Sequence, residues 1–145
     1  MIRAAAKNFK YVATLVDIED YEGLVNELKM HNGCTSYSFR QKLSQNAFSL
    51  SAYYDAMISN WMLDNITGVK PRRFSISAAL SQDLRYGENP HQSASFFLDE
   101  YLQGGIGASN QIQGKKLSYN NINDTDAALE LVNEFPQNDG AAAVI

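Results

Sequence analysis

The order of apolar and polar residues predicts helices and strands in alternation along the chain. Residues 3–8 are good helix formers, and the apolar positions within residues 11–17 predict a buried strand. A helix is predicted over residues 21–30, because its apolar residues share one face and the Asn-Gly pair at residues 32–33 is typical of a helix end. Strand, turn and helix in this order indicate the α/β class.

The clearest pattern is a long helix predicted over residues 35–64. Its apolar side chains recur at intervals of three and four residues, so they lie on one stripe of the helix surface. Such a stripe usually forms part of a core or a subunit contact, and seldom a cofactor site. The stripe comprises Leu43, Ala47, Leu50, Tyr54, Met57 and Trp61.

A linker is predicted at residues 65–73, where Gly68 and Pro71 interrupt the helical pattern. Glycine and proline are the residues that most often end a regular element. We therefore expect a domain boundary directly after the linker, which divides the chain into residues 1–73 and residues 74–145.

Short strands and a final helix are predicted beyond the linker. Apolar residues alternate over residues 74–80, and residues 94–98 form a second strand candidate. Residues 103–107 are rich in glycine but lack the lysine and hydroxyl of a phosphate-binding loop, so they predict a turn. The last helix is expected to begin near residues 123–126, whose side-chain oxygens can cap exposed amides. Its predicted buried side comprises Ala128, Leu131, Val132 and Phe135. The apolar run at residues 141–145 resembles a central strand.

Composition and charge narrow the classes of function. A formal net charge of −4 and a pI near 5.1 give no basic footprint for nucleic acid. The single cysteine, Cys34, cannot form an intrachain disulfide, and no metal site is predicted. No apolar run approaches the roughly 20 residues that cross a bilayer, and the first residues lack the apolar core of a secretory signal. We expect a soluble protein of the cytoplasm without a membrane partner.

The densest group of chemically useful residues is the segment LRYGENPHQ at residues 84–92. The Arg85 guanidinium can grip a phosphate or carboxamide through two hydrogen bonds, and the Tyr86 ring can stack on a heterocycle. Gly87 permits a close approach of backbone to ligand, and His91 can exchange a proton near neutral pH. Composition alone favours a plainer alternative, a polar loop with a satisfied histidine, because short polar motifs also arise by chance.

Four segments together resemble one family, the 5-aminoimidazole-4-carboxamide ribonucleotide formyltransferase/IMP cyclohydrolases. They occur in the family's order and cover essentially the whole chain. The four segments are residues 3–8 (RAAAKN), 47–55, 84–92 and 117–128. The resemblance implies an α/β fold in two parts. Residues 1–73 would be the tail of a Rossmann-like, methylglyoxal-synthase-like cyclohydrolase domain that includes the long helix. Residues 74–145 would be the start of a cytidine-deaminase-like transformylase domain.

The resemblance also implies a function and roles for single residues. A formyl group would pass from 10-formyltetrahydrofolate to the aminoimidazole ribonucleotide, and ring closure would then yield IMP, in a homodimer that needs no metal. Lys7 falls on a lysine of the cyclohydrolase site, where a cation can stabilise charge on an oxygen during closure. Arg85 and Tyr86 fall on residues that bind the substrate nucleotide, and Asn123 falls near another such position. His91 matches a recurring histidine with either a supporting or a catalytic role.

The resemblance further implies that the chain is an interior fragment, because family members continue beyond both of its ends. Catalytic groups act as units, so we expect the isolated chain to be inactive in both reactions. Two alternatives stay open. The apolar stripe from Leu43 to Trp61 would suit a non-catalytic helical interaction or assembly module. Arg85 and Tyr86 would also suit a simple nucleotide-binding domain.

Overall fold

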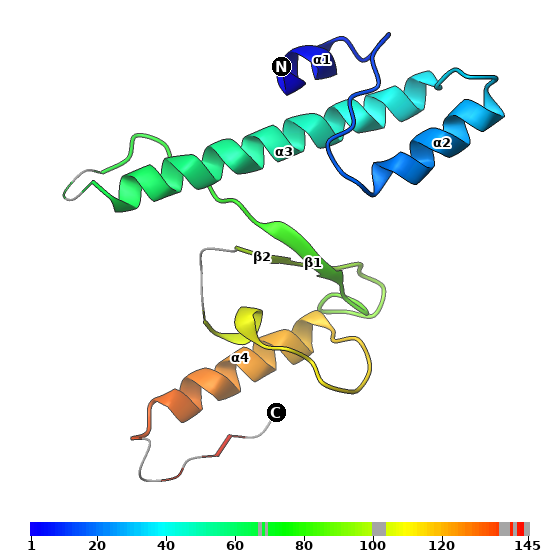
Figure 1. Ribbon diagram of the computed structural model, residues 1–145. Helices are drawn as coiled ribbons and strands as arrows, with labels where there is room; N and C mark the ends of the chain where they lie inside the picture. Colours follow the sequence, from blue (N-terminus) through cyan, green and yellow to red (C-terminus); the bar gives the residue numbers. More distant parts are fainter. Residues whose placement is uncertain (67, 69, 100–103, 137–139, 141, 144–145) are drawn as a thin grey trace. The chain divides into compact units, whose positions relative to one another are not determined.

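The chain forms two compact units, which we describe separately (Figure 1). The computed structural model describes residues 1–66, 68, 70–99, 104–136, 140 and 142–143. The first unit, Met1–Ser77, contains α1 (Ile2–Lys7), α2 (Asp20–Met30) and α3 (Tyr37–Asp64). The second unit, Ala78–Ile145, contains β1 (Ala79–Asp83), β2 (Ser95–Leu98), the 3-10 helix η1 (Ile106–Ala108) and α4 (Tyr119–Asn133). The division between the units lies a few residues beyond the boundary expected from the sequence.

The predicted long helix is confirmed as α3, and α1 packs against the first half of its apolar stripe. Leu43 and Ala47 of α3 are buried together with Ala6 of α1. The Ser44 hydroxyl donates a buried hydrogen bond of 2.8 Å to the backbone carbonyl of Ala6. These contacts form the core of the first unit and fix the end of α1 on α3.

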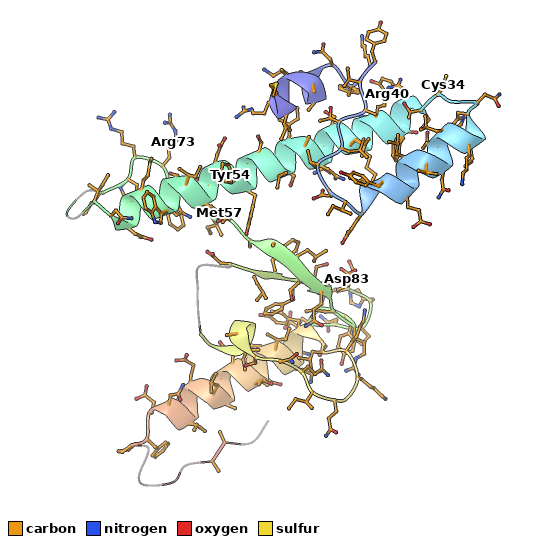
Figure 2. The ribbon with its side chains drawn as sticks, in the orientation of Figure 1. Cys34, Arg40, Tyr54, Met57, Arg73 and Asp83 are labelled. Atoms are coloured by element: carbon orange, nitrogen blue, oxygen red, sulfur yellow. The ribbon has the colours of Figure 1, made fainter. Side chains whose placement is uncertain are left out.

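The second half of the stripe is not part of this core, because Leu50, Tyr54 and Trp61 are exposed and Met57 is half-buried, so a subunit contact there stays a prediction. Tyr54 is 61% exposed and Trp61 is 54% exposed. Figure 2 labels Tyr54 and Met57 on this half of α3. The helical pattern thus identifies which residues share a face. How much of that face is buried depends on α1, which is short and covers only part of α3.

The strand predicted at residues 11–17 is wrong. This segment is an irregular connection with no ladder hydrogen bonds among the described residues, and Tyr11 is 89% exposed. A strand needs a neighbour to satisfy its backbone groups. Just before this connection, the Phe9 carbonyl accepts a 2.9 Å hydrogen bond from the Arg40 guanidinium, which ties the chain to α3 there.

The predicted second helix and its end are confirmed in α2. Asn32 adopts a left-handed backbone with φ of 52°, and the Gly33 amide donates a 2.7 Å hydrogen bond to the Leu28 carbonyl. Asparagine and glycine tolerate this conformation, so they close the last turn of a helix well. Beyond the turn, the Glu27 carboxylate accepts a 2.7 Å hydrogen bond from the Ser36 amide, which links α2 to the start of α3.

The second unit begins with an antiparallel hairpin of β1 and β2, with an irregularity between Leu80 and Gln82. The prediction for residues 94–98 is confirmed by β2. The strand predicted over residues 74–80 is wrong for most of its length, because β1 begins only at Ala79 and Phe74 is 76% exposed. Backbone pairing with β2 decides where the strand starts. Residues 74–78 alternate in polarity but pair with no strand in the described part of the chain.

The last helix begins earlier than predicted. Ser118 caps α4 in a capping box. The Ser118 hydroxyl accepts a hydrogen bond from the Asn121 amide, and the Asn121 side chain accepts one from the Ser118 amide. The predicted start at residues 123–126 is therefore wrong by about one turn, since this reciprocal pair satisfies the first free amides. Of the predicted buried side, Ala128 and Val132 are half-buried, while Leu131 and Phe135 are exposed.

The remaining predictions fall near η1 and at the chain's last residues. Gly104 and Gly105 form the predicted turn before η1, with positive φ at both, and residue 103 lies outside the described residues. Most of the strand expected at residues 141–145 also lies outside them.

In the described part of the chain, no helix combines the length and the apolar character that a bilayer crossing requires. The mixture of helices and strands agrees with the predicted α/β class.

Candidate functional site

The segment at residues 84–92 forms a loop that is fixed to the start of α4 by backbone hydrogen bonds. The Arg85 amide donates to the Leu117 carbonyl at 2.8 Å, and the Tyr119 amide donates to the Tyr86 carbonyl at 3.2 Å. Arg85 and Tyr86 therefore lie beside residues 117–119, which are more than thirty positions away in sequence. Both side chains project from a backbone that two hydrogen bonds attach to residues 117–119.

Gly87 is required for a close approach within the loop. Its amide donates to the Gln92 carbonyl at 2.9 Å, and a Cβ added at Gly87 would lie 3.0 Å from the Gln92 Cβ. The Gln92 side chain in turn accepts a 2.8 Å hydrogen bond from the Asn89 amide. The structure thus shows that the absence of a side chain at Gly87 makes room for Gln92, and the approach of a ligand to the Gly87 backbone stays a prediction.

Two residues that the sequence analysis did not single out join this loop to α4. The Asn120 side-chain amide donates to the Glu88 carbonyl at 3.0 Å. Ser118 is fully buried and forms the cap of α4. The Ser-x-x-Asn spacing of a capping box at residues 118–121 was the available signal for Ser118, whereas nothing local in the sequence indicates that Asn120 reaches Glu88.

Arg85 and Tyr86 form a stacked and hydrogen-bonded pair. The Arg85 Cζ lies 4.8 Å from the centroid of the Tyr86 ring, and Arg85 Nη2 donates to the Tyr86 hydroxyl at 3.2 Å. A hydrogen bond from Ser118, followed by the hydrogen bond and positive charge of Arg85, lowers the pKa of Tyr86 below its ordinary value. Arg85 is exposed, so its other N–H groups can meet an anionic or carbonyl ligand.

The other predicted site residues have no hydrogen bond to Arg85 or Tyr86 among the contacts of the described residues. His91 is exposed in the same loop, and Asn123 is exposed in the second turn of α4. Lys7 is the last residue of α1, in the other unit, and is exposed. The described residues contain no group of three or more His, Cys, Asp or Glu that could hold a metal ion.

Two cavities border the site's elements. A cavity of about 270 Å³ lies directly at the loop and is lined by Gly87, Glu88, Ala94 and Tyr119. A second one, of about 330 Å³, lies between the hairpin, η1 and α4 and mixes apolar with uncharged polar side chains. Its lining includes Gln82, Phe96, Leu98, Asn110, Leu117 and Ile122. The first cavity opens beside the backbone that carries the Arg85–Tyr86 pair.

Comparison with known sequences identifies the family. The profile of the AICARFT/IMPCHase bienzyme family matches residues 5–145. The chain belongs to this family. Similar AICARFT/IMPCHase relatives are the bifunctional purine biosynthesis proteins PurH of Dinoroseobacter shibae, 54% identical over 145 residues, and of Roseobacter denitrificans, 52% identical over 145 residues. Each alignment covers the whole chain, which spans 27% of the length of each relative.

The AICARFT/IMPCHase match extends over both units and includes the loop at residues 84–92. It begins within the 3–8 segment and includes Lys7. All five predicted site residues therefore lie inside the matched part of the chain.

Proposed function

We propose that this chain takes part in the last two steps of purine synthesis to IMP, as a portion of a bifunctional formyltransferase and IMP cyclohydrolase. The first step moves a formyl group from 10-formyltetrahydrofolate to the exocyclic amine of 5-aminoimidazole-4-carboxamide ribonucleotide. The carboxamide nitrogen then attacks the formyl carbon, and water leaves as the ring closes. The observation that carries the proposal is the paired Arg85 and Tyr86 on the fixed loop of a chain in the AICARFT/IMPCHase family.

Arg85 and Tyr86 are proposed to bind the substrate nucleotide. The free N–H groups of Arg85 suit a phosphate or carboxamide oxygen, because a guanidinium presents paired donors in a fixed plane. The Tyr86 ring suits the flat imidazole, since aromatic faces stack on heterocycles. Hydrogen bonds to Leu117 and Tyr119 fix the loop backbone, which lowers the conformational entropy lost when the two side chains are ordered on binding.

The remaining sites are proposals from the family. Lys7 is proposed to serve ring closure, where its ammonium would stabilise negative charge on the reacting oxygen. Its place at the exposed end of α1 leaves the side chain accessible. We propose a supporting or proton-transferring role for His91 and a nucleotide contact for Asn123, both of which are exposed near the loop or in α4.

The same proposal covers domains, partners and location. Residues 1–73 would belong to a Rossmann-like, methylglyoxal-synthase-like cyclohydrolase domain and residues 74–145 to a cytidine-deaminase-like formyltransferase domain. Folate is the proposed co-substrate, and the whole enzyme is proposed to act as a homodimer in the cytoplasm. The acidic composition supports the absence of a nucleic-acid partner.

The test is a chimaera in which residues 1–145 replace the corresponding stretch of the Dinoroseobacter shibae PurH protein. We expect the chimaera to convert the aminoimidazole ribonucleotide to IMP when 10-formyltetrahydrofolate is supplied. Arg85→Ala should lower kcat/KM for formyl transfer about 10- to 100-fold, the effect of losing a charged hydrogen bond. Arg85→Lys should recover only part of the loss, because lysine keeps the charge without the paired donors. A folded chimaera without formyl transfer, or one indifferent to Arg85→Ala, would overturn the proposal.

A second candidate function, a non-catalytic helical assembly module, is favoured by the exposed half of α3. Leu50, Tyr54 and Trp61 present apolar surface there, and such surface often meets a partner. This alternative predicts that Trp61→Ser in the chimaera changes the oligomeric state and that Arg85→Ala changes nothing. Normal assembly with Trp61→Ser and impaired formyl transfer with Arg85→Ala would exclude it.

A further inference from the structure

Lys7, the proposed ring-closure residue, lies at the end of a helix that is too short to be stable by itself. α1 has six residues, whereas isolated helices shorter than about 12 residues are marginal in water. The position of Lys7 therefore depends on the first half of α3, against which α1 packs. The Arg3–Asp55 ion pair, at 3.4 Å, also joins the two helices but adds little, because both side chains are exposed to water.

Two side chains of α3 attach the backbone on either side of Lys7. The Ser44 hydroxyl donates to the Ala6 carbonyl at 2.8 Å, and the Arg40 Nε donates to the Phe9 carbonyl at 2.9 Å. Arg40 and Ser44 are four residues apart in α3, so they lie on the same face of the helix. Only two residues, Lys7 included, lie between the two attached carbonyls. The short stretch that carries Lys7 is therefore bound to α3 at both of its ends.

Arg40 is itself held in place at the start of α3 (Figure 2). Its Nη1 donates to the Thr35 carbonyl and, at 3.1 Å, to the Thr35 hydroxyl oxygen. The guanidinium is planar, so these bonds also set the direction of the Nε–H that meets Phe9. The Phe9 ring lies against Tyr37 of α3, with the ring centroids 5.4 Å apart. The attachment at Phe9 thus comes from a charged donor whose own orientation is fixed, and such hydrogen bonds are stronger than neutral ones.

We propose that Arg40 is a positioning residue for ring closure, which together with Ser44 fixes the backbone from which the Lys7 side chain reaches the reacting oxygen. This inference rests on the proposed function of Lys7. An ammonium stabilises developing charge best when it is already in place, because no energy is then spent on reorienting it during the reaction. A displacement of about 1 Å caused by a substitution far from the chemistry can cost about 100-fold in rate. In this role Arg40 acts through the position of Lys7, without contacting the substrate.

The experiment measures ring closure by the chimaera, with the formylated aminoimidazole ribonucleotide supplied directly. Arg40→Met should lower kcat for IMP formation about 10- to 100-fold, with KM nearly unchanged, since the lost interaction concerns charge that develops only during the reaction. Arg40→Lys should recover part of the rate, because it keeps a charged donor without the planar fork. Ser44→Ala should lower kcat about 5-fold, the effect of one neutral hydrogen bond. Formyl transfer should stay unchanged, because its proposed residues lie in the other unit.

A double-mutant cycle with Lys7→Met separates positioning from a general loss of stability. If Arg40 acts through Lys7, Arg40→Met should lower kcat little further once Lys7→Met has removed the ammonium. An equal further loss in the Lys7→Met background would overturn the inference and leave Arg40 as a structural residue. Asn46→Ala is the matched control, since the Asn46 side chain bonds Asp20 at 3.2 Å and so joins α3 to α2. It should leave kcat unchanged, and a loss as large as that of Arg40→Met would also overturn the inference.

The two proposals fail in different ways. If Lys7→Met leaves ring closure unchanged, the proposed function of Lys7 is wrong. If Lys7→Met lowers kcat while Arg40→Met does not, the function stands and the positioning role of Arg40 is wrong. Retained formyl transfer shows that a variant is folded, and if Arg40→Met does not fold, Arg40→Lys and Ser44→Ala in the same cycle decide between these outcomes.

Discussion

The side-chain amide of Asn120 donates a 3.0 Å hydrogen bond to the backbone carbonyl of Glu88, 32 residues earlier in the chain. Asn120 lies in the first turn of α4, and Glu88 lies in the loop that carries Arg85 and Tyr86. Together with the backbone bonds to Leu117 and Tyr119, this contact closes the loop onto the helix. A rigid helix end thus positions residues that the loop alone would leave mobile.

Asn120→Ala should loosen the loop without unfolding α4. One hydrogen bond is worth about 1 kcal/mol, so amides in residues 84–92 should exchange with solvent about 5-fold faster if they exchange by local opening. Hydrogen exchange with mass spectrometry on the chimaera measures this. Asn133→Ala, at the other end of α4, is the control and should leave exchange in the loop unchanged. Unchanged exchange with Asn120→Ala would show that the backbone hydrogen bonds to Leu117 and Tyr119 hold the loop on α4 without the Asn120 side chain.

Gly87→Ala should distort the same loop by a steric route. The new Cβ would lie 3.0 Å from the Gln92 Cβ and 3.1 Å from its Oε1, and Gly87 is buried, so the neighbouring chain must shift. Overpacking of this kind costs about 1–3 kcal/mol, and we expect weaker nucleotide binding by the chimaera in calorimetry. Gly23→Ala is the matched control. Its Cβ would meet only the edge of Phe39 at 3.4 Å, and alanine favours the helix, so that variant should be as stable as the parent or slightly more.

Sequence periodicity predicted the elements whose stability is local. The stripe of α3 and the Asn-Gly end of α2 follow from the spacing and backbone preferences of neighbouring residues. The strands predicted at residues 11–17 and 74–80 failed because strand pairing depends on a second segment, which alternation in one segment does not reveal. The start of α4 was misplaced because residues 118–126 contain several capping side chains, and only the reciprocal Ser118–Asn121 pair decides between them.

In the candidate site too, features set by neighbouring residues could be predicted and contacts with distant segments could not. Arg85 and Tyr86 are adjacent in sequence, and their residue types suit a phosphate and a heterocycle, but composition alone favoured a polar loop and only the resemblance to the family indicated a nucleotide site. Asn120 comes from a distant segment and acts through one side-chain amide, so no local pattern pointed to it, whereas the Ser-x-x-Asn spacing was a local signal for the Ser118 cap. The close approach of Gln92 to Gly87 is likewise a contact that no local pattern in the sequence indicates.

Ser44→Ala should weaken the attachment of α1 to α3. The Ser44 hydroxyl is the donor to the Ala6 carbonyl at 2.8 Å in the core of the first unit, and its loss leaves that carbonyl without this partner. The Ala6 carbonyl keeps the Phe9 amide at 3.3 Å, so the cost is that of one hydrogen bond, about 1 kcal/mol. Amides of α1 in the chimaera should therefore exchange about 5-fold faster. Ser49→Ala, at an exposed position of the same helix, should leave α1 unaffected. Equal exchange in the two variants would contradict the prediction.

Glu27 makes the junction between α2 and α3 sensitive to acid. The hydrogen bond from the Ser36 amide, with smaller contributions from the Ser36 side chain and the charges of His31 and Arg40, lowers the pKa of Glu27 below its ordinary value of 4.5. A carboxyl with a lowered pKa in the folded state stabilises that state fully above its unfolded pKa, and the stabilisation is lost as the pH falls through the folded pKa. Glu27→Gln cannot ionise, and its neutral oxygen accepts the Ser36 amide more weakly.

The parent chimaera should therefore protect the first amides of α3 better than Glu27→Gln at neutral pH. The difference should stay constant as the pH falls toward 4.5 and then shrink below it, because the parent carboxyl becomes protonated and the two side chains become alike. Hydrogen exchange at a series of pH values, normalised to the intrinsic rate at each, measures this difference. A gap between the two proteins that persists unchanged well below pH 4.5 would mean that the Glu27 side chain stabilises the junction by packing, independently of its charge.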